Sequence, residues 1–166
     1  MTRTGTLDMT FPSDREILLT RTVNAPRHLV YKAWTTPQLV KKWWAGRRGE
    51  MTVAEMDFRV GGTWRYAMVA HGGFEVAFHG TYQEIVPDER IVHTEIMEAP
   101  EAAPDSEEGA VVNTVTFSDA DGGATLVSIR TDAGSKEVRD MIARSGMEGG
   151  VREQFELLEE LAQEPG

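Results

Sequence analysis

Between Glu50 and Asp132 the sequence alternates apolar and polar residues with a period of two. Alternation of this kind is typical of strands that bury one face, and short turns make neighbouring strands antiparallel. The pattern therefore predicts a meander of about six antiparallel strands. Clusters of Gly, Pro and Asp separate the strands at residues 60–62, 71–73, 87–89, 99–109 and 119–123.

The segment before this meander predicts one strand and two short helices. Arg15 to Val23 is rich in Ile, Leu, Thr and Val, which favour a strand. Asn24 is expected to cap a helix that has Pro26 in its first turn. The run Thr35-Thr36-Pro37 ends this helix and begins a second one, which finishes at Trp43-Trp44.

The C-terminal segment predicts a long helix. Apolar residues recur at helical spacing from Ser135 to Gln163. Gly146, Gly149 and Gly150 weaken this helix and are expected to leave a void beside it. Because an apolar sheet face needs a cover, we expect this helix to lie on the sheet. The prediction is an α+β domain over residues 15–163, in which a curved sheet of about seven strands wraps around the final helix, with a flexible arm at 1–14.

Two adjacent glycines, Gly61 and Gly62, mark a turn between strands. A phosphate-binding loop would be followed by a helix, whereas a strand pattern follows here. A three-residue loop at 60–62, with Gly62 in the left-handed conformation, gives one wholly apolar face. It pairs Phe58 with Trp64 and Met56 with Tyr66 on that face, and Asp57 with Arg65 on the other.

The composition excludes several functional classes. The chain has 17 basic and 27 acidic residues, a net charge of −10, which disfavours binding to nucleic acid. It contains no cysteine, which excludes disulfides, thiolate catalysis and sulfur-ligated metals. We find no run of about 20 apolar residues that would span a membrane, and no signal peptide. A cytoplasmic location is therefore expected.

Four phrases, taken in order, resemble one known superfamily: "NAPRHLVYKAWTTPQLVKKWW", "MDFRVGGTWRYAM", "GTYQEIVPDERIVHTE" and "SGMEGGVREQFELLEELA". From about Glu16 to Ala162 the chain is similar to the SRPBCC or START-like superfamily, in the branch homologous to the activator of heat shock protein 90 ATPase. The resemblance implies a helix-grip fold with a cavity between the curved sheet and the final helix, used across the superfamily for apolar small molecules. It covers only the C-terminal domain of the co-chaperone.

Methionine and aromatic side chains are expected to line that cavity. They could equally fill a dry core, and the resemblance favours a pocket for apolar ligands. Trp34 is expected in the core, whereas adjacent helical positions place one of Trp43 and Trp44 inward and the other at the rim. The expected lining residues are Trp44, Met56, Phe58, Trp64, Tyr66, Met68, Phe78, Tyr82, Val115, Phe117, Met141, Met147, Val151 and Phe155.

None of the four histidines has a partner at metal-ligand spacing, so no metal or cofactor is predicted. His28, His71 and His79 are expected at the surface. In "IVHTEIM" two phases are open. One brings His93 and Glu95 into the cavity, where they could exchange a proton with a ligand, assisted by Tyr66 or Tyr82. The other buries Val92, Thr94 and Ile96, and we favour it.

The sequence therefore predicts a carrier or sensor of an apolar or amphipathic small molecule without an assigned reaction. One alternative is an enzyme of the cyclase, dehydratase or hydrolase type that uses polar groups in the cavity, which an ionisable pair inside the cavity would favour. Another is an interaction protein that modulates a chaperone. A protein partner or a homodimer is also compatible with the sequence.

Overall fold

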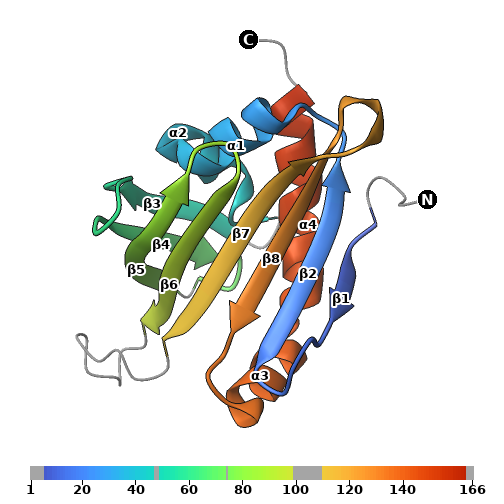
Figure 1. The fold of residues 1–166 in the computed structure, drawn as a ribbon. Coiled ribbons are helices and arrows are strands. Elements are labelled where there is room, and N and C mark those ends of the chain that lie inside the picture. Colours follow the sequence, from blue (N-terminus) through green and yellow to red (C-terminus); the bar gives the residue numbers. More distant parts are fainter. Residues whose placement is uncertain (1–5, 47–48, 74, 99–109, 164–166) are drawn as a thin grey trace.

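The computed structural model describes residues 6–46, 49–73, 75–98 and 110–163. One eight-stranded sheet has the strand order β1-β2-β8-β7-β6-β5-β4-β3, and all of its neighbouring pairs are antiparallel (Figure 1). The six-strand meander predicted from the alternation is confirmed as β3 to β8. The strands are β1 (Asp8–Thr10), β2 (Glu16–Val23), β3 (Gly49–Met56), β4 (Thr63–Ala70), β5 (Glu75–Val86), β6 (Arg90–Glu98), β7 (Val111–Asp119) and β8 (Thr125–Asp132).

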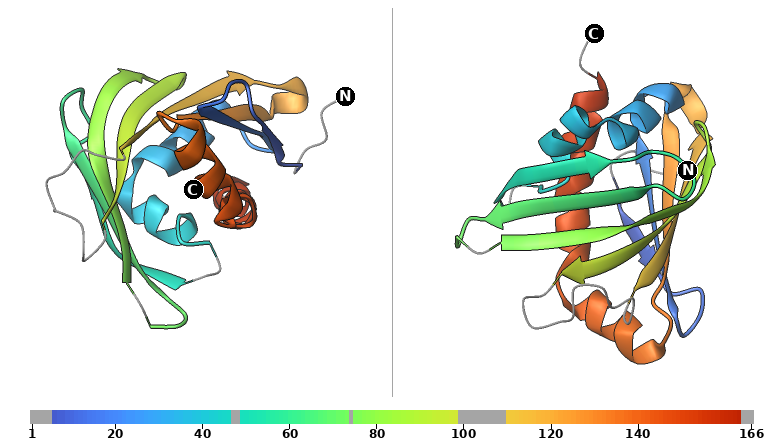
Figure 2. Two further views of the ribbon diagram at one scale, coloured as in Figure 1. Left: turned by 90° about the horizontal axis from the view of Figure 1, so that it is seen from below. Right: turned by 90° about the vertical axis from the view of Figure 1, so that its left-hand side faces the viewer.

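The helices lie inside the curve of the sheet (Figure 2). Two short helices follow β2, and the C-terminal helix runs along the concave face, as the helix-grip prediction required. A 3-10 turn, η1 (Asp121–Gly123), joins β7 to β8. The helices are α1 (Arg27–Thr35), α2 (Pro37–Trp43), α3 (Lys136–Arg144) and α4 (Met147–Gln163).

The eighth strand is β1, which lies in the segment expected to be a flexible arm. Its residues pair with β2, Asp8 opposite Thr20 and Thr10 opposite Leu18. Met9 packs against the hydrophobic core from this edge position. Three residues with one apolar side chain are too short to give a strand pattern in the sequence, so pairing with β2 decides this structure.

The predicted C-terminal helix is two helices. α3 begins at a cap in which the Ser135 hydroxyl accepts a hydrogen bond from the Val138 backbone N–H, at 3.2 Å. Gly146, with φ of +86°, separates α3 from α4 in a conformation that glycine adopts without strain. The break changes the helical phase, so the single stripe was wrong at Met141. That side chain is 64% exposed, while Ile142 packs on the core.

The glycine side of α4 borders the chain that follows α2. A Cβ built on Gly46 would lie 3.2 Å from Glu153 Cβ and 3.8 Å from the Gly150 carbonyl oxygen. Gln154 also donates a hydrogen bond from its side-chain amide to the Trp44 carbonyl. Gly150 therefore lies near this connection, and the void predicted between the glycines and the sheet stays a prediction.

The β3–β4 connection has a different register from the predicted one. Met56 lies opposite Trp64, and the connecting loop covers residues 57–62. Gly61, not Gly62, takes the left-handed conformation, with φ of +86°. Backbone hydrogen bonds hold the longer loop, from the Gly62 N–H to the Arg59 carbonyl and from the Gly61 N–H to the Tyr82 carbonyl, each at 2.8 Å. The predicted faces nevertheless hold, because Trp64 is buried and Asp57 is exposed.

An ionic contact joins α4 to β2. The Arg21 guanidinium, 3% exposed, donates to the Glu159 carboxylate at 3.2 Å and lies over the Phe155 ring. The same carboxylate accepts the Asn24 backbone N–H at 2.8 Å. Asn24, expected to cap α1, does not do so, because Pro26 occupies the N-cap without a side-chain bond.

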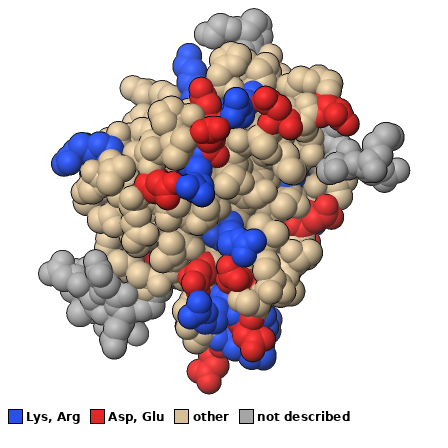
Figure 3. All heavy atoms as spheres, in the orientation of Figure 1, with Lys and Arg blue, Asp and Glu red and all other residues tan. Residues whose placement is uncertain are grey.

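Charged side chains of both signs are interspersed over the face shown in Figure 3. Several form ion pairs within one helix, such as Lys136 with Asp140 and Arg152 with Glu148. No helix in the described part of the chain is both long and apolar enough to cross a membrane.

Leu158 provides a test of the contact between α4 and the sheet. Its side chain is fully buried, so Leu158→Ala should lower the free energy of unfolding by about 2–5 kcal/mol. Urea denaturation measures the change, and Glu160→Ala, at an exposed position of the same helix, is the control. Equal effects of the two substitutions would show that α4 does not form the core contact described.

Candidate functional site

The concave face has two zones, and the first is closed core. Val115, Phe117 and Phe155 are 1–3% exposed. Helix α1 covers Phe117, whose ring centroid lies 5.5 Å from that of Tyr31 and 5.7 Å from that of Trp34. Phe155, on α4, packs against the Trp34 ring at 6.1 Å. These three predicted lining residues therefore belong to the packed core between the sheet and the helices.

The second zone carries an aromatic wall, defined as Trp44, Trp64, Tyr66 and Phe78. Ring centroids are 5.3 Å apart for Trp44 and Tyr66, 5.4 Å for Trp44 and Phe78, and 4.8 Å for Trp64 and Tyr66. Trp64 and Tyr66 are buried, whereas Trp44 and Phe78 are half-buried. The wall therefore has its accessible edge at Trp44 and Phe78.

The two tryptophans at the end of α2 divide as predicted. Trp43 is 4% exposed and donates its indole N–H to the Ala33 carbonyl at 3.0 Å. Trp44 is half-buried and contacts the wall. Successive helical residues point about 100° apart, which separates the two indoles.

His93 and Glu95 face the concave side, so the phase that we favoured from the sequence was wrong. The His93 ring lies 5.4 Å from Trp64 and 6.4 Å from Tyr82, centroid to centroid. Ile91, in the same phase, is 2% exposed. Pairing across the sheet sets this phase, because His93 lies opposite Tyr82 on β5 and Asn113 on β7.

One carbonyl group orients two of these rings. The Thr94 carbonyl oxygen lies 3.1 Å from the Trp64 indole nitrogen and 3.3 Å from His93 Nδ1. Because a carbonyl only accepts, His93 carries its proton on Nδ1 and presents Nε2 as an acceptor. Burial lowers the pKa of His93 to about 4, so the ring is neutral at pH 7.

The hydroxyls of Tyr66 and Tyr82 hydrogen bond to each other, and the Tyr82 ring lies next to the imidazole. Burial raises the pKa of both Tyr66 and Tyr82 above the usual tyrosine value. The negative charge of Glu95 is close enough to contribute to the shift at Tyr66. The two hydroxyls stay protonated at neutral pH and serve as neutral donors or acceptors.

Glu95 is the unusual member of the group. Its side chain is half-buried, and burial raises the pKa of the carboxyl to about 7. Within the described ranges, no hydrogen bond or ion pair to this carboxyl is present. The structure thus brings together the four weak catalytic candidates from the sequence, His93, Glu95, Tyr66 and Tyr82.

The polar row continues onto β7 and β8, which the sequence analysis missed. Asn113 is paired with His93 across the strands, and the Thr131 hydroxyl donates to its side-chain oxygen at 2.6 Å. Both side chains are buried. Asn113 is in phase with Val111, Val115 and Phe117, and that alternation was the available signal.

The other predicted lining residues lie at intermediate depth. Phe58 stacks edge to face on Tyr82, with centroids 5.1 Å apart. Met68 is half-buried on the wall side of β4. Partly buried side chains that pack on the core include Met56, Phe58, Met147 and Val151. Whether these residues contact a ligand stays a prediction.

A pocket of about 600 Å³ lies on the outer face of β4 to β6. Two of its lining side chains share one partner, since Arg65 makes two hydrogen bonds to Glu98, at 2.9 and 3.0 Å, and His79 makes one at 3.0 Å. The sequence analysis did not find this pocket. Its lining is Glu55, Met56, Asp57, Thr63, Trp64, Arg65, His79, Gly80, Thr81, Thr94 and Ile96.

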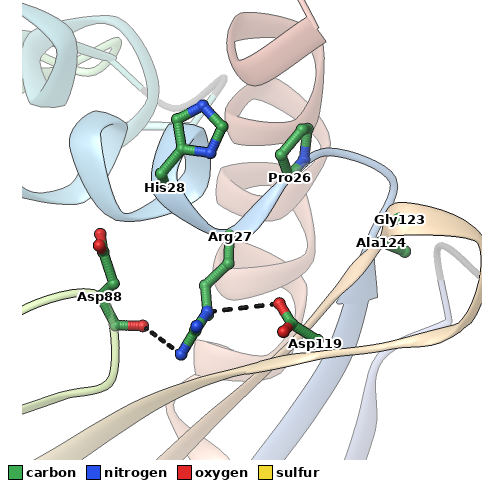
Figure 4. Close-up of a pocket in the computed structure, with 7 residues that line it drawn as sticks. All are labelled: Pro26, Arg27, His28, Asp88, Asp119, Gly123 and Ala124. Carbon is green, nitrogen blue, oxygen red and sulfur yellow. Dashed lines mark hydrogen bonds and ion pairs between the residues drawn. The ribbon is translucent and has the colours of Figure 1, made fainter.

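A smaller pocket of about 290 Å³ lies at the start of α1 (Figure 4). Its guanidinium, on Arg27, is held by the Asp88 carbonyl and the Asp119 carboxylate, each at 3.3 Å. Both pockets thus contain groups that already satisfy one another. The concave-face cluster differs because Glu95 is half-buried and has no such partner among the described residues.

Three of the histidines lie away from this cluster. His28 borders the pocket of Figure 4, His71 follows β4, and His79 pairs with Glu98. Among the residues that the structure describes, no three His, Asp or Glu side chains are grouped to hold a metal ion.

Comparison with solved structures shows the same fold in several bacterial proteins. A protein from Rhodobacter sphaeroides has a TM-score of 0.83 and 22% identity, with 94% of this chain and 97% of that chain covered. A protein from Chromobacterium violaceum has a TM-score of 0.75 and 28% identity, with 90% of this chain and 99% of that chain covered. A protein from Mycobacterium smegmatis has a TM-score of 0.84 and 18% identity, with 97% of this chain and 99% of that chain covered.

No curated protein matches the chain at a significant level. A family model does match, over residues 24–163, and its description is Activator of Hsp90 ATPase homolog 1-like protein. The match covers both short helices, β3 to β8 and the C-terminal helices, and the SRPBCC-type resemblance is thereby confirmed. The chain belongs to the Activator of Hsp90 ATPase homolog 1-like family.

Proposed function

We propose that this protein binds an amphipathic small molecule on its concave face, between the aromatic wall and α4. The observation that carries the proposal is the half-buried Glu95 carboxyl, which lies beside aromatic side chains and has no partner among the described residues. Burial of a polar group without a partner is unfavourable, so a bound molecule that supplies the partner would offset this cost.

The surroundings of Glu95 match what a ligand site requires. Such sites combine an apolar lining with a few polar groups that fix orientation. Trp44 and Phe78 supply accessible aromatic surface. Tyr66, Tyr82 and Nε2 of His93 supply hydrogen-bonding groups that are neutral at pH 7.

A second candidate function is general acid–base catalysis, favoured by the presence of an ionisable pair in the cluster. An efficient acid or base has a pKa near the working pH, which Glu95 meets with a pKa of about 7. In this reading Glu95 moves the proton, and the tyrosine hydroxyls orient the reacting group. Chaperone modulation, suggested by the family description, stays a prediction.

Binding of a brominated ligand is expected to quench the fluorescence of the tryptophans in the wall. A neutral amphiphile with a brominated chain should bind with a saturable micromolar Kd, about 8 kcal/mol, and raise the melting temperature. Trp44→Phe and Trp64→Phe should each remove part of the quenching. The control is Trp34→Phe, which removes a half-buried indole that packs on Phe117 and Phe155 outside the wall and should leave the quenched component in place. Quenching shared equally by all three would place the probe elsewhere.

Catalysis is tested with a panel of p-nitrophenyl esters as hydrolysis probes. If Glu95 acts as a base, kcat/KM should rise with pH to a plateau above about 7, following its ionisation. Glu95→Gln should then lose about 10²-fold or more in rate while the brominated probe still binds. A rate no faster than buffer for every ester, or one unchanged by the substitution, would argue for a carrier.

The stability of the protein should also report the ionisation of Glu95. The carboxyl loses its proton near 4.5 when unfolded but near 7 when folded, so ionisation destabilises the fold as pH rises between these values. The free energy of unfolding of Glu95→Gln, relative to that of wild type, should therefore rise by about 1–3 kcal/mol between pH 4.5 and pH 8. Urea melts across this range measure the gain.

His93 affects stability in the opposite direction. Comparing Glu95→Gln with wild type at each pH cancels this effect, because both proteins contain His93. Its lowered pKa makes wild-type stability fall as pH decreases from about 6.5 through 4. Glu55→Gln removes a carboxylate from an exposed position of β3 and controls for net charge. A constant difference between Glu95→Gln and wild type would show that the fold does not retain the proton.

A further inference from the structure

We propose that the ligand carries a cationic head, a quaternary or protonated amine, held between the Glu95 carboxylate and the aromatic wall. This inference rests on the proposed function and names its ligand class. It depends on the position of one acidic side chain among rings that attract positive charge.

The strand register places Glu95 beside the wall. On β5 and β6, Phe78 is opposite Met97 and Tyr82 is opposite His93, and Glu95 lies between these two pairs. Trp64, on β4, crosses to β6 and donates to the Thr94 carbonyl. The carboxyl therefore has aromatic side chains on both sides along its own face of the sheet.

The site is open on the side of β6 where a ligand head would enter. Met97, two residues beyond Glu95 in the same phase, is 61% exposed. Trp44 and Phe78 form the accessible edge of the wall. A head group of a few atoms reaching Glu95 would therefore contact these rings.

The chemistry of the site favours a cation over a neutral or anionic head. Aromatic faces attract cations, and the attraction is stronger where water is excluded. The Glu95 carboxylate adds an ion pair with either kind of cationic head, and a protonated amine can also donate a hydrogen bond to it. Within the described residues no Lys or Arg pairs with Glu95, so the charge complement has to come from the ligand.

Three ligands with the same alkyl chain length isolate the effect of head-group charge on affinity. Decyltrimethylammonium is the cation, decyldimethylamine N-oxide is its net-neutral counterpart, and decyl sulfate is the anion. Calorimetric titration at pH 8, below micelle formation, should show the cation binding at least about tenfold more tightly than the N-oxide.

Glu95→Gln should reduce this preference to about twofold or less, because it replaces the carboxylate by a neutral amide of the same shape. The chain has a net charge of −10, which attracts any cation weakly. Glu55→Gln removes the same charge from an exposed position of β3 and should keep the preference. A preference that survives Glu95→Gln, or an N-oxide or sulfate that binds as tightly as the cation, would overturn the inference.

Failure of the proposed function gives a different result, because then none of the three ligands binds saturably to wild type.

A measurement on wild type alone guards against misfolding of Glu95→Gln. The groups that face Glu95 among the described residues are Tyr66, Tyr82 and His93, none of which titrates between pH 6 and 8. Affinity of wild type for the cation should therefore fall about tenfold from pH 8 to pH 6, as Glu95 gains a proton near 7. A flat profile would contradict the inference.

Discussion

The coverage of the concave sheet face by helices is the constraint on which the rest of this structure depends. A helix is about 10 Å across and neighbouring strands lie about 4.8 Å apart, so one helix covers about two strands. Helix α4 seals the strands near β2, where Arg21 and Glu159 fix its position and Phe155 is buried. The eight strands extend well beyond that width. The concave face over β5 and β6 is therefore only partly covered at Phe78, His93 and Glu95, and this half-buried surface is where a ligand would lie.

Polar groups on this face follow from the same geometry. Glu95 would be unfavourable in a closed core, because burying an ionised group without a partner costs more free energy than its packing contacts contribute. Asn113 and Thr131, deeper in the sheet, avoid this cost by bonding to each other. Glu95 keeps partial contact with solvent instead and retains its proton to about pH 7. Local rules of this kind are usually broken at functional sites, and Glu95 breaks one here.

Periodicity predicted the meander, the two short helices and the covering helix, because each depends on residues close in sequence. The orientation of β6 could not be read in this way. Both faces of "IVHTEIM" mix apolar and polar residues, and the choice depends on a register shift on β5 between Tyr82 and Glu84. The prediction of the β3–β4 loop failed similarly, because Gly61 and Gly62 exchange backbone hydrogen bonds with Tyr82 on β5, contacts that the glycine pattern does not show. Such contacts appear only when strands are placed side by side.

Gly80 shows how one backbone position links the two faces of the sheet. A Cβ at Gly80 would lie 1.9 Å from the Thr94 carbonyl oxygen and 2.8 Å from the Trp64 indole nitrogen. Its absence lets the indole pass over β5 and donate to that carbonyl. The same oxygen accepts from His93 and fixes its tautomer, while the Thr94 hydroxyl accepts the Thr81 backbone N–H within the outer pocket. The arrangement of the wall, the protonation of His93 and the shape of the outer pocket therefore share one requirement, a strand position without a side chain.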